Sequence, residues 1–124
     1  MLRLGSLLDD FLEIGIKTQI VKSGNIVNEK EFQRGGDLRS LASKIRRAKK
    51  VGLLDEAARK DADTLRKIRN EFAHLKTKLD FYSPEIENLA AQLSTYDATL
   101  PNQKAIEAAM DKVTDHLKAA VKAL

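Results

Sequence analysis

The segment IEAAMDKVTDHLKAAVKAL, residues 106–124, decides the fold class because its apolar residues recur every three or four positions. That spacing places them on one side of an α-helix and leaves the charged residues on the other. No part of the chain sustains an alternation of apolar and polar residues, so we predict helices and no sheet. The apolar stripe consists of Ile106, Ala109, Met110, Val113, Leu117, Ala120, Val121 and Leu124.

The same period appears in four further segments, which gives five predicted helices in a chain of 124 residues. The first spans residues 4–22, the second 38–50 and the third 55–75, and the fourth begins at Pro84 after Ser83. Proline favours the first position of a helix, because its missing N–H has no partner there. This length suits one domain. We therefore predict an all-α, single-domain helical bundle of about five helices that covers residues 1–124.

The first predicted helix is apolar on more than one side. Its main stripe contains Leu4, Leu8, Phe11, Leu12, Ile16 and Ile20. Leu7, Ile14 and Val21 widen this stripe beyond a single face. A helix of this kind needs partners on two sides, as in the centre of a bundle or at a subunit interface. We therefore expect a homodimer.

The ends of the second and third helices carry recognisable signals. Asp37 is the predicted N-cap of the second helix and Asp55 that of the third, since a short side-chain oxygen accepts from the first free N–H groups. Gly52 can adopt the left-handed conformation that ends a helix, and Leu53 can then fold back on the last turn. The polar stretch from Ser23 to Gly36 is predicted to be a long loop.

The composition is typical of a soluble protein. The chain has no cysteine, which excludes disulfides and thiolate metal sites and fits a reducing compartment. No stretch approaches the roughly 20 apolar residues of a membrane span. Asp9, Asp10 and Glu13 interrupt the N-terminal apolar run, unlike the core of a signal peptide. We expect a cytoplasmic protein without membrane contact.

The net charge of +4 is unevenly distributed. Residues 39–78 contain 13 Lys/Arg and 5 Asp/Glu, a net of +8, and the rest of the chain carries −4. Arg39, Arg46, Arg47 and Lys50 fall on the outer side of the second helix and are candidate nucleic-acid-binding residues. The alternative is a bundle whose helices carry different surface charge, because no run of five basic residues occurs.

Arg69, Asn70 and His74 lie close together on the third predicted helix. At 100° per residue, Arg69 falls on the flank of the apolar side, and Asn70 and His74 share a face directed away from it. Histidine can transfer protons near neutral pH, and arginine offers a forked donor to phosphate. The alternative is a solvated row in which Asp63 and Lys67 form an ion pair four residues apart. His116 has no acidic or histidine partner at ligand spacing, and we expect neither a metal nor another cofactor.

Two resemblances bear on this segment. RNEFAH, residues 69–74, resembles the motif of arginine, four residues and histidine in the HEPN superfamily (higher eukaryotes and prokaryotes nucleotide-binding). LASKIRRAKKVGLLDEAARKDADTLRKIRNEFAH, residues 41–74, together with GSLLDDFLE, residues 5–13, resembles the mannitol operon repressor family. The second likeness covers roughly residues 5–80, and residues 95–124 carry no recognised motif.

The resemblances imply different functions. The repressor family implies a non-enzymatic helical dimer in transcriptional control, without an obvious helix-turn-helix. Residues 55–63 contain four acids among nine residues, a poor surface for a major groove, so a regulator of this kind is expected to act through a protein partner or through an unconventional nucleic-acid contact. The HEPN likeness implies a metal-independent ribonuclease with Arg69 as phosphate binder, His74 as general acid or base, and Asn70 in support. A basic polyanion-binding module is the third alternative.

Overall fold

A computed structural model of the protein describes residues 3–73 and 83–124, and these residues contain helices and no strand. The predicted all-α bundle is confirmed. The helices are α1 (Arg3–Lys22), the 3-10 helix η1 (Glu29–Phe32), α2 (Leu41–Lys50), α3 (Glu56–Ala73), α4 (Pro84–Ala90) and α5 (Asn102–Lys122). None of these described helices has the length and apolar character that crossing a membrane requires.

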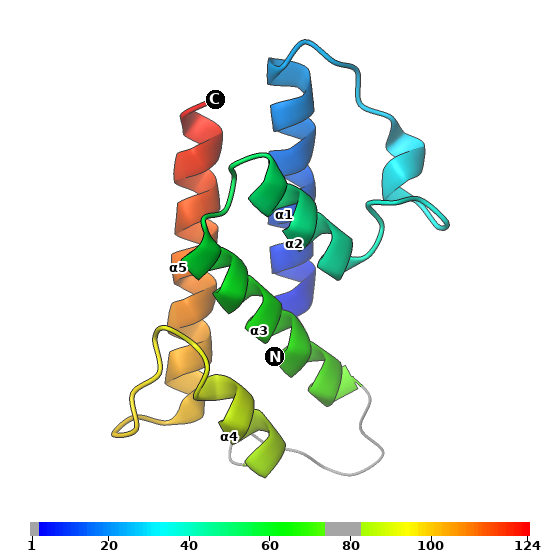
Figure 1. Cartoon of the computed structure of the whole chain (residues 1–124). Helices are drawn as coiled ribbons and strands as arrows, with labels where there is room; N and C mark the ends of the chain where they lie inside the picture. Colours follow the sequence, from blue (N-terminus) through cyan, green and yellow to red (C-terminus); the bar gives the residue numbers. More distant parts are fainter. Residues whose placement is uncertain (1–2, 74–82) are drawn as a thin grey trace.

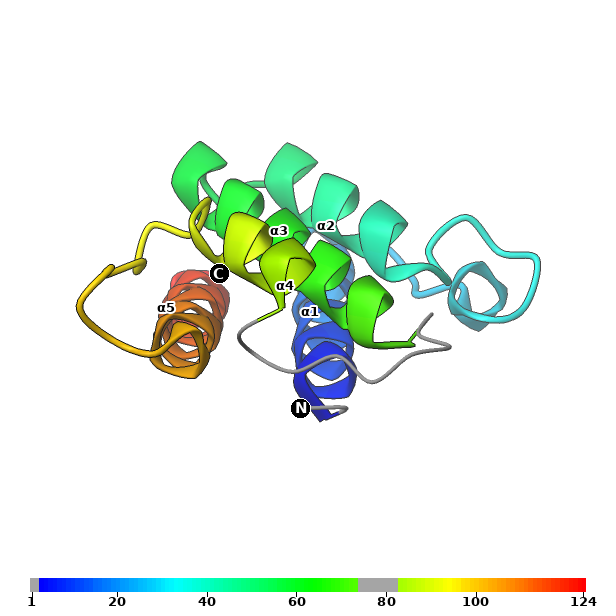
Figure 2. The ribbon, with the colours of Figure 1, turned by 90° about the horizontal axis from the view of Figure 1, so that it is seen from below.

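The helices form two layers. α2, α3 and α4 lie side by side in one layer, and α1 and α5 form the other (Figure 2). α1 and α5 run in the same direction, and α3 packs across both of them (Figure 1). The loop that carries η1 extends to one side of α2 (Figure 1). Within residues 3–73 and 83–124, no other helix covers the outer sides of α1 and α2 (Figure 2).

The core lies between the layers and is lined by the predicted stripes. α5 contributes Ile106, Ala109, Met110, Val113 and Leu117, all buried as its spacing predicts. The stripe ends earlier than predicted, because Ala120 and Val121 are only partly buried and Leu124 is exposed. Burial of such a stripe is the main favourable term for a helix of this kind.

The two faces of α1 differ as its composition suggests. Leu8, Leu12 and Ile16 are fully buried against the other helices. Leu7, Ile14 and Val21 are 49%, 59% and 60% exposed. Since they are spaced by seven residues, about two turns, they form an apolar row on one outer face of the helix.

The corner between α2 and α3 follows the sequence prediction. Gly52 adopts φ +85°, a conformation that strains residues with a side chain. The Leu53 N–H donates to the Ala48 carbonyl at 2.8 Å, and the Leu53 side chain is buried. Asp55 caps α3 as predicted, because its Oδ1 accepts from the Ala58 N–H at 2.8 Å.

Asp37 is not the N-cap of α2, and this prediction is wrong. Ser40 occupies the cap, and its Oγ accepts from the Ser43 N–H at 3.1 Å. Leu38 does not belong to the helix, and its N–H donates to the Glu31 carbonyl at 2.7 Å. Leu38 is buried even though it lies outside the helix.

The predicted long loop before α2 contains η1. Asn28 caps this short helix through its side chain, and Phe32 packs onto the core under the Lys17 ammonium, 4.9 Å from the ring centre. Gly36 lies directly against the carbonyls of Lys30 and Glu31, where a Cβ atom would clash. This segment is therefore folded back onto the rest of the protein, which its polar composition does not indicate.

Candidate functional site

Arg69 and Asn70 lie near the C-terminal end of the described part of α3. The Arg69 Nη2 donates to Asn70 Oδ1 at 3.1 Å, so the amide holds one branch of the guanidinium. The Nε of Arg69 is buried and has no hydrogen-bond partner among the described residues. Both side chains are partly buried, as expected for a flank position of Arg69. His74, the third residue of the predicted site, lies outside the described residues.

The outer row of α3 consists of ion pairs. Asp63 Oδ2 lies 3.6 Å from Lys67 Nζ, the pair expected from their spacing, and its Oδ1 lies 2.9 Å from Arg66 Nη2. One turn earlier, Arg59 Nη2 lies 2.6 Å from Glu56 Oε1. Its hydrogen bonds hold the pKa of the Glu56 carboxyl below its ordinary value. Three cations of α3, Arg59, Arg66 and Lys67, are therefore paired with acids of the same helix.

The predicted cations of α2 have no such neighbours. Arg46 and Lys50 are exposed and Arg47 is partly exposed, and the three surround a shallow hollow of about 210 Å³. Arg39 is exposed before the helix begins and does not line this hollow. None of the four side chains forms an ion pair with any other described residue.

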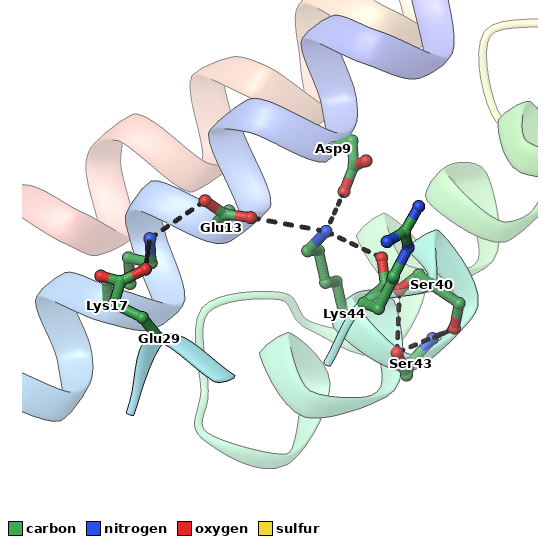
Figure 3. Close-up of polar contacts among 8 residues, drawn as sticks. Asp9, Glu13, Lys17, Glu29, Ser40, Ser43 and Lys44 are labelled. Carbon is green, nitrogen blue, oxygen red and sulfur yellow. Dashed lines mark hydrogen bonds and ion pairs between the residues drawn. The ribbon is translucent and has the colours of Figure 1, made fainter. Parts of the chain in front are cut away.

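The lysine that the sequence reading missed is Lys44. Its side chain turns away from the other cations of α2 into the layer interface, where only 3% of the residue is exposed. Its Nζ lies 2.5 Å from Asp9 Oδ1 and 3.6 Å from Glu13 Oε1, and it donates to the Arg39 carbonyl at 3.1 Å (Figure 3). This cluster joins α1 to α2.

Glu13 extends the cluster along α1. Its Oε2 accepts from Lys17 Nζ at 3.1 Å, and Lys17 also donates to Glu29 of η1 at 2.9 Å (Figure 3). The hydrogen bond to Glu29, followed by that to Glu13, raises the pKa of Lys17. One signal could have identified Lys44: a lysine on the apolar side of a helix, together with two acids four residues apart on another helix.

Asp61 is a second buried charge that the sequence reading missed. It lies on the inner side of α3 with 2% of the residue exposed. It accepts from the Ser94 N–H at 2.9 Å and from the Ser94 hydroxyl at 2.5 Å. Lys112 of α5 donates to the same hydroxyl at 3.0 Å. The contact ties the turn after α4 to α3 and α5, so Asp61 has a structural role.

An apolar groove lies between α1 and α5. It has a volume of about 280 Å³ and is lined by Phe11, Ile14, Gly15, Leu117 and Val121, with Lys118 and Lys122 at its rim. Gly15 helps to form the groove, because an added Cβ would already contact Leu53 and Val121. The groove is continuous with the exposed apolar row of α1, which passes through Ile14.

No group of three or more metal-binding side chains occurs within residues 3–73 and 83–124. His116 is partly exposed on α5 and forms no hydrogen bond or ion pair with that part of the chain. No protein-family model, curated protein or solved structure matches this chain. The resemblances to the mannitol operon repressor family and to the HEPN superfamily thus rest on the sequence motifs alone.

Proposed function

We propose that the chain is a non-enzymatic regulator of transcription resembling the mannitol operon repressor, a cytoplasmic helical dimer that acts through protein partners. The observation that carries this proposal is the outer face of α1, where Leu7, Ile14 and Val21 are about half exposed or more in a single chain. A contiguous apolar face of this kind marks an interaction site in a soluble protein. The ion-paired outer row of α3 supports contact with proteins, because Arg59, Arg66 and Lys67 already have acidic partners on the same helix.

A second copy of the chain fits the apolar face by charge. Lys118 Nζ lies 5.4 Å from the centre of the Phe11 ring, at one edge of the apolar row. Asp10 is exposed at nearly the same height, and by the rotation of the helix it lies at the opposite edge. A two-fold axis parallel to α1 brings the Lys118 edge of each copy against the Asp10 edge of the other.

The opposite packing is disfavoured. A two-fold axis perpendicular to α1 in the same interface would place α5 against α5 and bring the rim lysines Lys118 and Lys122 of the two copies together. Like charges at an interface suppress the wrong arrangement. The charges at the two edges therefore favour parallel packing of the two α1 helices.

Light scattering tests the dimer. We expect twice the 13.8 kDa chain mass at micromolar concentration and the single-chain mass for Ile14→Asp. Ile26→Asp is the matched control, since Ile26 is 93% exposed outside α1 and should keep the dimer. Asp10→Lys should weaken the dimer, and adding Lys118→Asp should restore it. A wild-type chain that stays monomeric would contradict the proposed interface.

Transcript profiling in the native host tests the regulation. Deletion of the protein should change a small set of operons, and Ile14→Asp should reproduce that profile while Ile26→Asp should not. A deletion that leaves all transcripts unchanged would refute the regulatory role, even if the dimer forms.

A metal-independent ribonuclease is the second candidate, favoured by the hydrogen bond between Arg69 and Asn70 and by the buried Arg69 Nε. This function requires cleavage of RNA in the presence of a chelator, with loss of cleavage in Arg69→Ala and His74→Ala. Intact RNA after incubation with the folded wild-type protein would exclude it.

A further inference from the structure

The outer face of α2 concentrates positive charge without compensation. The helix LASKIRRAKK carries five cations and no acid, so it cannot neutralise itself as α3 does. Lys44 is directed inward to Asp9 and Glu13. The pKa of Glu56 is lowered chiefly by its hydrogen bonds from Arg59 and to a lesser degree by Lys49, so this acid compensates part of the Lys49 charge. Arg46, Arg47 and Lys50 remain for a ligand.

The hollow between these three side chains has the chemistry of a phosphate site. Arg46 and Lys50 are four residues apart, about 5–6 Å along one face, so both can approach one anionic group. The two guanidinium groups offer forked pairs of donors that match phosphate oxygens. Ser43 lines the hollow, but its hydroxyl donates to the Ser40 carbonyl at 2.8 Å, so the cations are the available donors.

One acid lies at the rim of the hollow. Asp37 is exposed there and forms no ion pair with the three cations, so the site keeps an excess of two positive charges. Arg39, two residues further on, is also exposed and does not line the hollow. The surface can therefore contact more than one anionic group.

We propose that this face binds the phosphate backbone of a double-helical nucleic acid without reading its bases. A duplex presents about one negative charge per 1.7 Å of its axis, whereas an acidic protein surface usually intersperses acids with bases. Among the described residues no aromatic side chain lines the hollow, so they offer no platform for stacking unpaired bases. This inference goes beyond regulation through protein partners, because it gives the chain a direct contact with nucleic acid.

The test is fluorescence anisotropy with a labelled DNA duplex of about 20 base pairs and arbitrary sequence. Three phosphate contacts predict a slope near −2.7 in log affinity against log salt, a loss of roughly fortyfold from 50 to 200 mM. The triple variant Arg46→Gln, Arg47→Gln, Lys50→Gln should lose most of this affinity and salt dependence. All three positions are at the surface, so the fold should persist by circular dichroism.

The matched control removes three ion-paired cations from α3 by Arg59→Gln, Arg66→Gln and Lys67→Gln, and it should reduce the affinity by less than about threefold. Equal losses in the two triple variants would overturn the proposal, as would salt-independent binding or no binding at low salt. Polyglutamate that displaces the duplex at an equal concentration of charge would also overturn it, in favour of an acidic protein partner.

Discussion

α2 and α3 are neighbours joined by one tight corner, and both carry rows of cations. They differ in whether those cations are paired with acids of the same helix. On α3, Glu56 and Asp63 each precede an arginine by three residues and hold it in an ion pair. On α2, no acid is present to do this. Net charge alone therefore does not identify a binding surface, because the local spacing of opposite charges decides which cations remain available.

The inner sides of the two helices show the reverse pattern. α2 buries a cation, Lys44, between two partly exposed carboxylates of α1. α3 buries an anion, Asp61, against a backbone N–H and a hydroxyl. In both helices the buried charge joins separate elements, so each contributes to positioning as well as to stability. Variants of these clusters measure how much each buried charge contributes to stability.

The largest effect is expected when Lys44 loses both carboxylates. Asp9→Asn with Glu13→Gln leaves a buried ammonium without a counter-charge, which should lower the free energy of unfolding by about 3–5 kcal/mol. Lys44→Met should cost less, because the carboxylates of Asp9 and Glu13 are about one-third exposed and can be solvated. Urea denaturation of the two variants measures this difference.

Asp10→Asn is the control for this comparison, since Asp10 is exposed and forms no ion pair with other described residues of its own chain. It should change stability by no more than about 0.5 kcal/mol. The measurement is made on the Ile14→Asp background, so that dimerisation does not contribute. If the Asp9/Glu13 variant matched Asp10→Asn, the buried cluster would have no role in joining α1 to α2.

A smaller loss is expected on α3. Asp61→Ala leaves the Ser94 N–H and hydroxyl without their acceptor, which should cost about 2–3 kcal/mol. Asp61→Asn retains one carbonyl oxygen for the N–H and should cost about half as much. Ser94→Ala tests the hydroxyl alone. If all three variants were as stable as the wild type in urea, Asp61 would not anchor the turn after α4.

The sequence predicts the apolar stripes, the corner at Gly52 and the cap at Asp55, because each depends on residues within a few positions of one another. It misplaces the start of α2, since Asp37 and Ser40 both have capping side chains and the Leu38 N–H bonds to distant Glu31. The burial of Lys44 could not be predicted locally, because it depends on α1 packing against α2.

The candidate site follows the same division. The exposure of Arg46 and Lys50 could be predicted from the period of α2, whereas Arg39 lies before the helix that was expected to contain it. The sequence does not say that these cations stay unpaired, because an acid from another element could have reached them. Nor does it predict the bond between Arg69 and Asn70, which depends on side-chain conformations. Helical periodicity predicts which cations are exposed, and the neighbouring elements determine whether those cations are already paired with acids.

The smallest effect concerns the outer row of α3. If pairing keeps its cations from binding polyanions, then Glu56→Gln with Asp63→Asn should free Arg59, Arg66 and Lys67 and raise duplex affinity roughly two- to fivefold. The hydrogen bonds from Arg59 depress the pKa of Glu56, so at neutral pH the carboxylate is charged and the pair is intact. That pair is lost only as the pH falls through this depressed value, so the measurement belongs near pH 7.

A control variant separates the effect of local pairing from the effect of net charge. Glu107→Gln removes one exposed acid from α5 and changes net charge without freeing any cation of α3. An affinity gain per removed acid equal to that of the α3 variant would mean that overall charge, and not local pairing, controls binding. A gain confined to the α3 variant would show that the two helices differ because one of them supplies its own counter-charges.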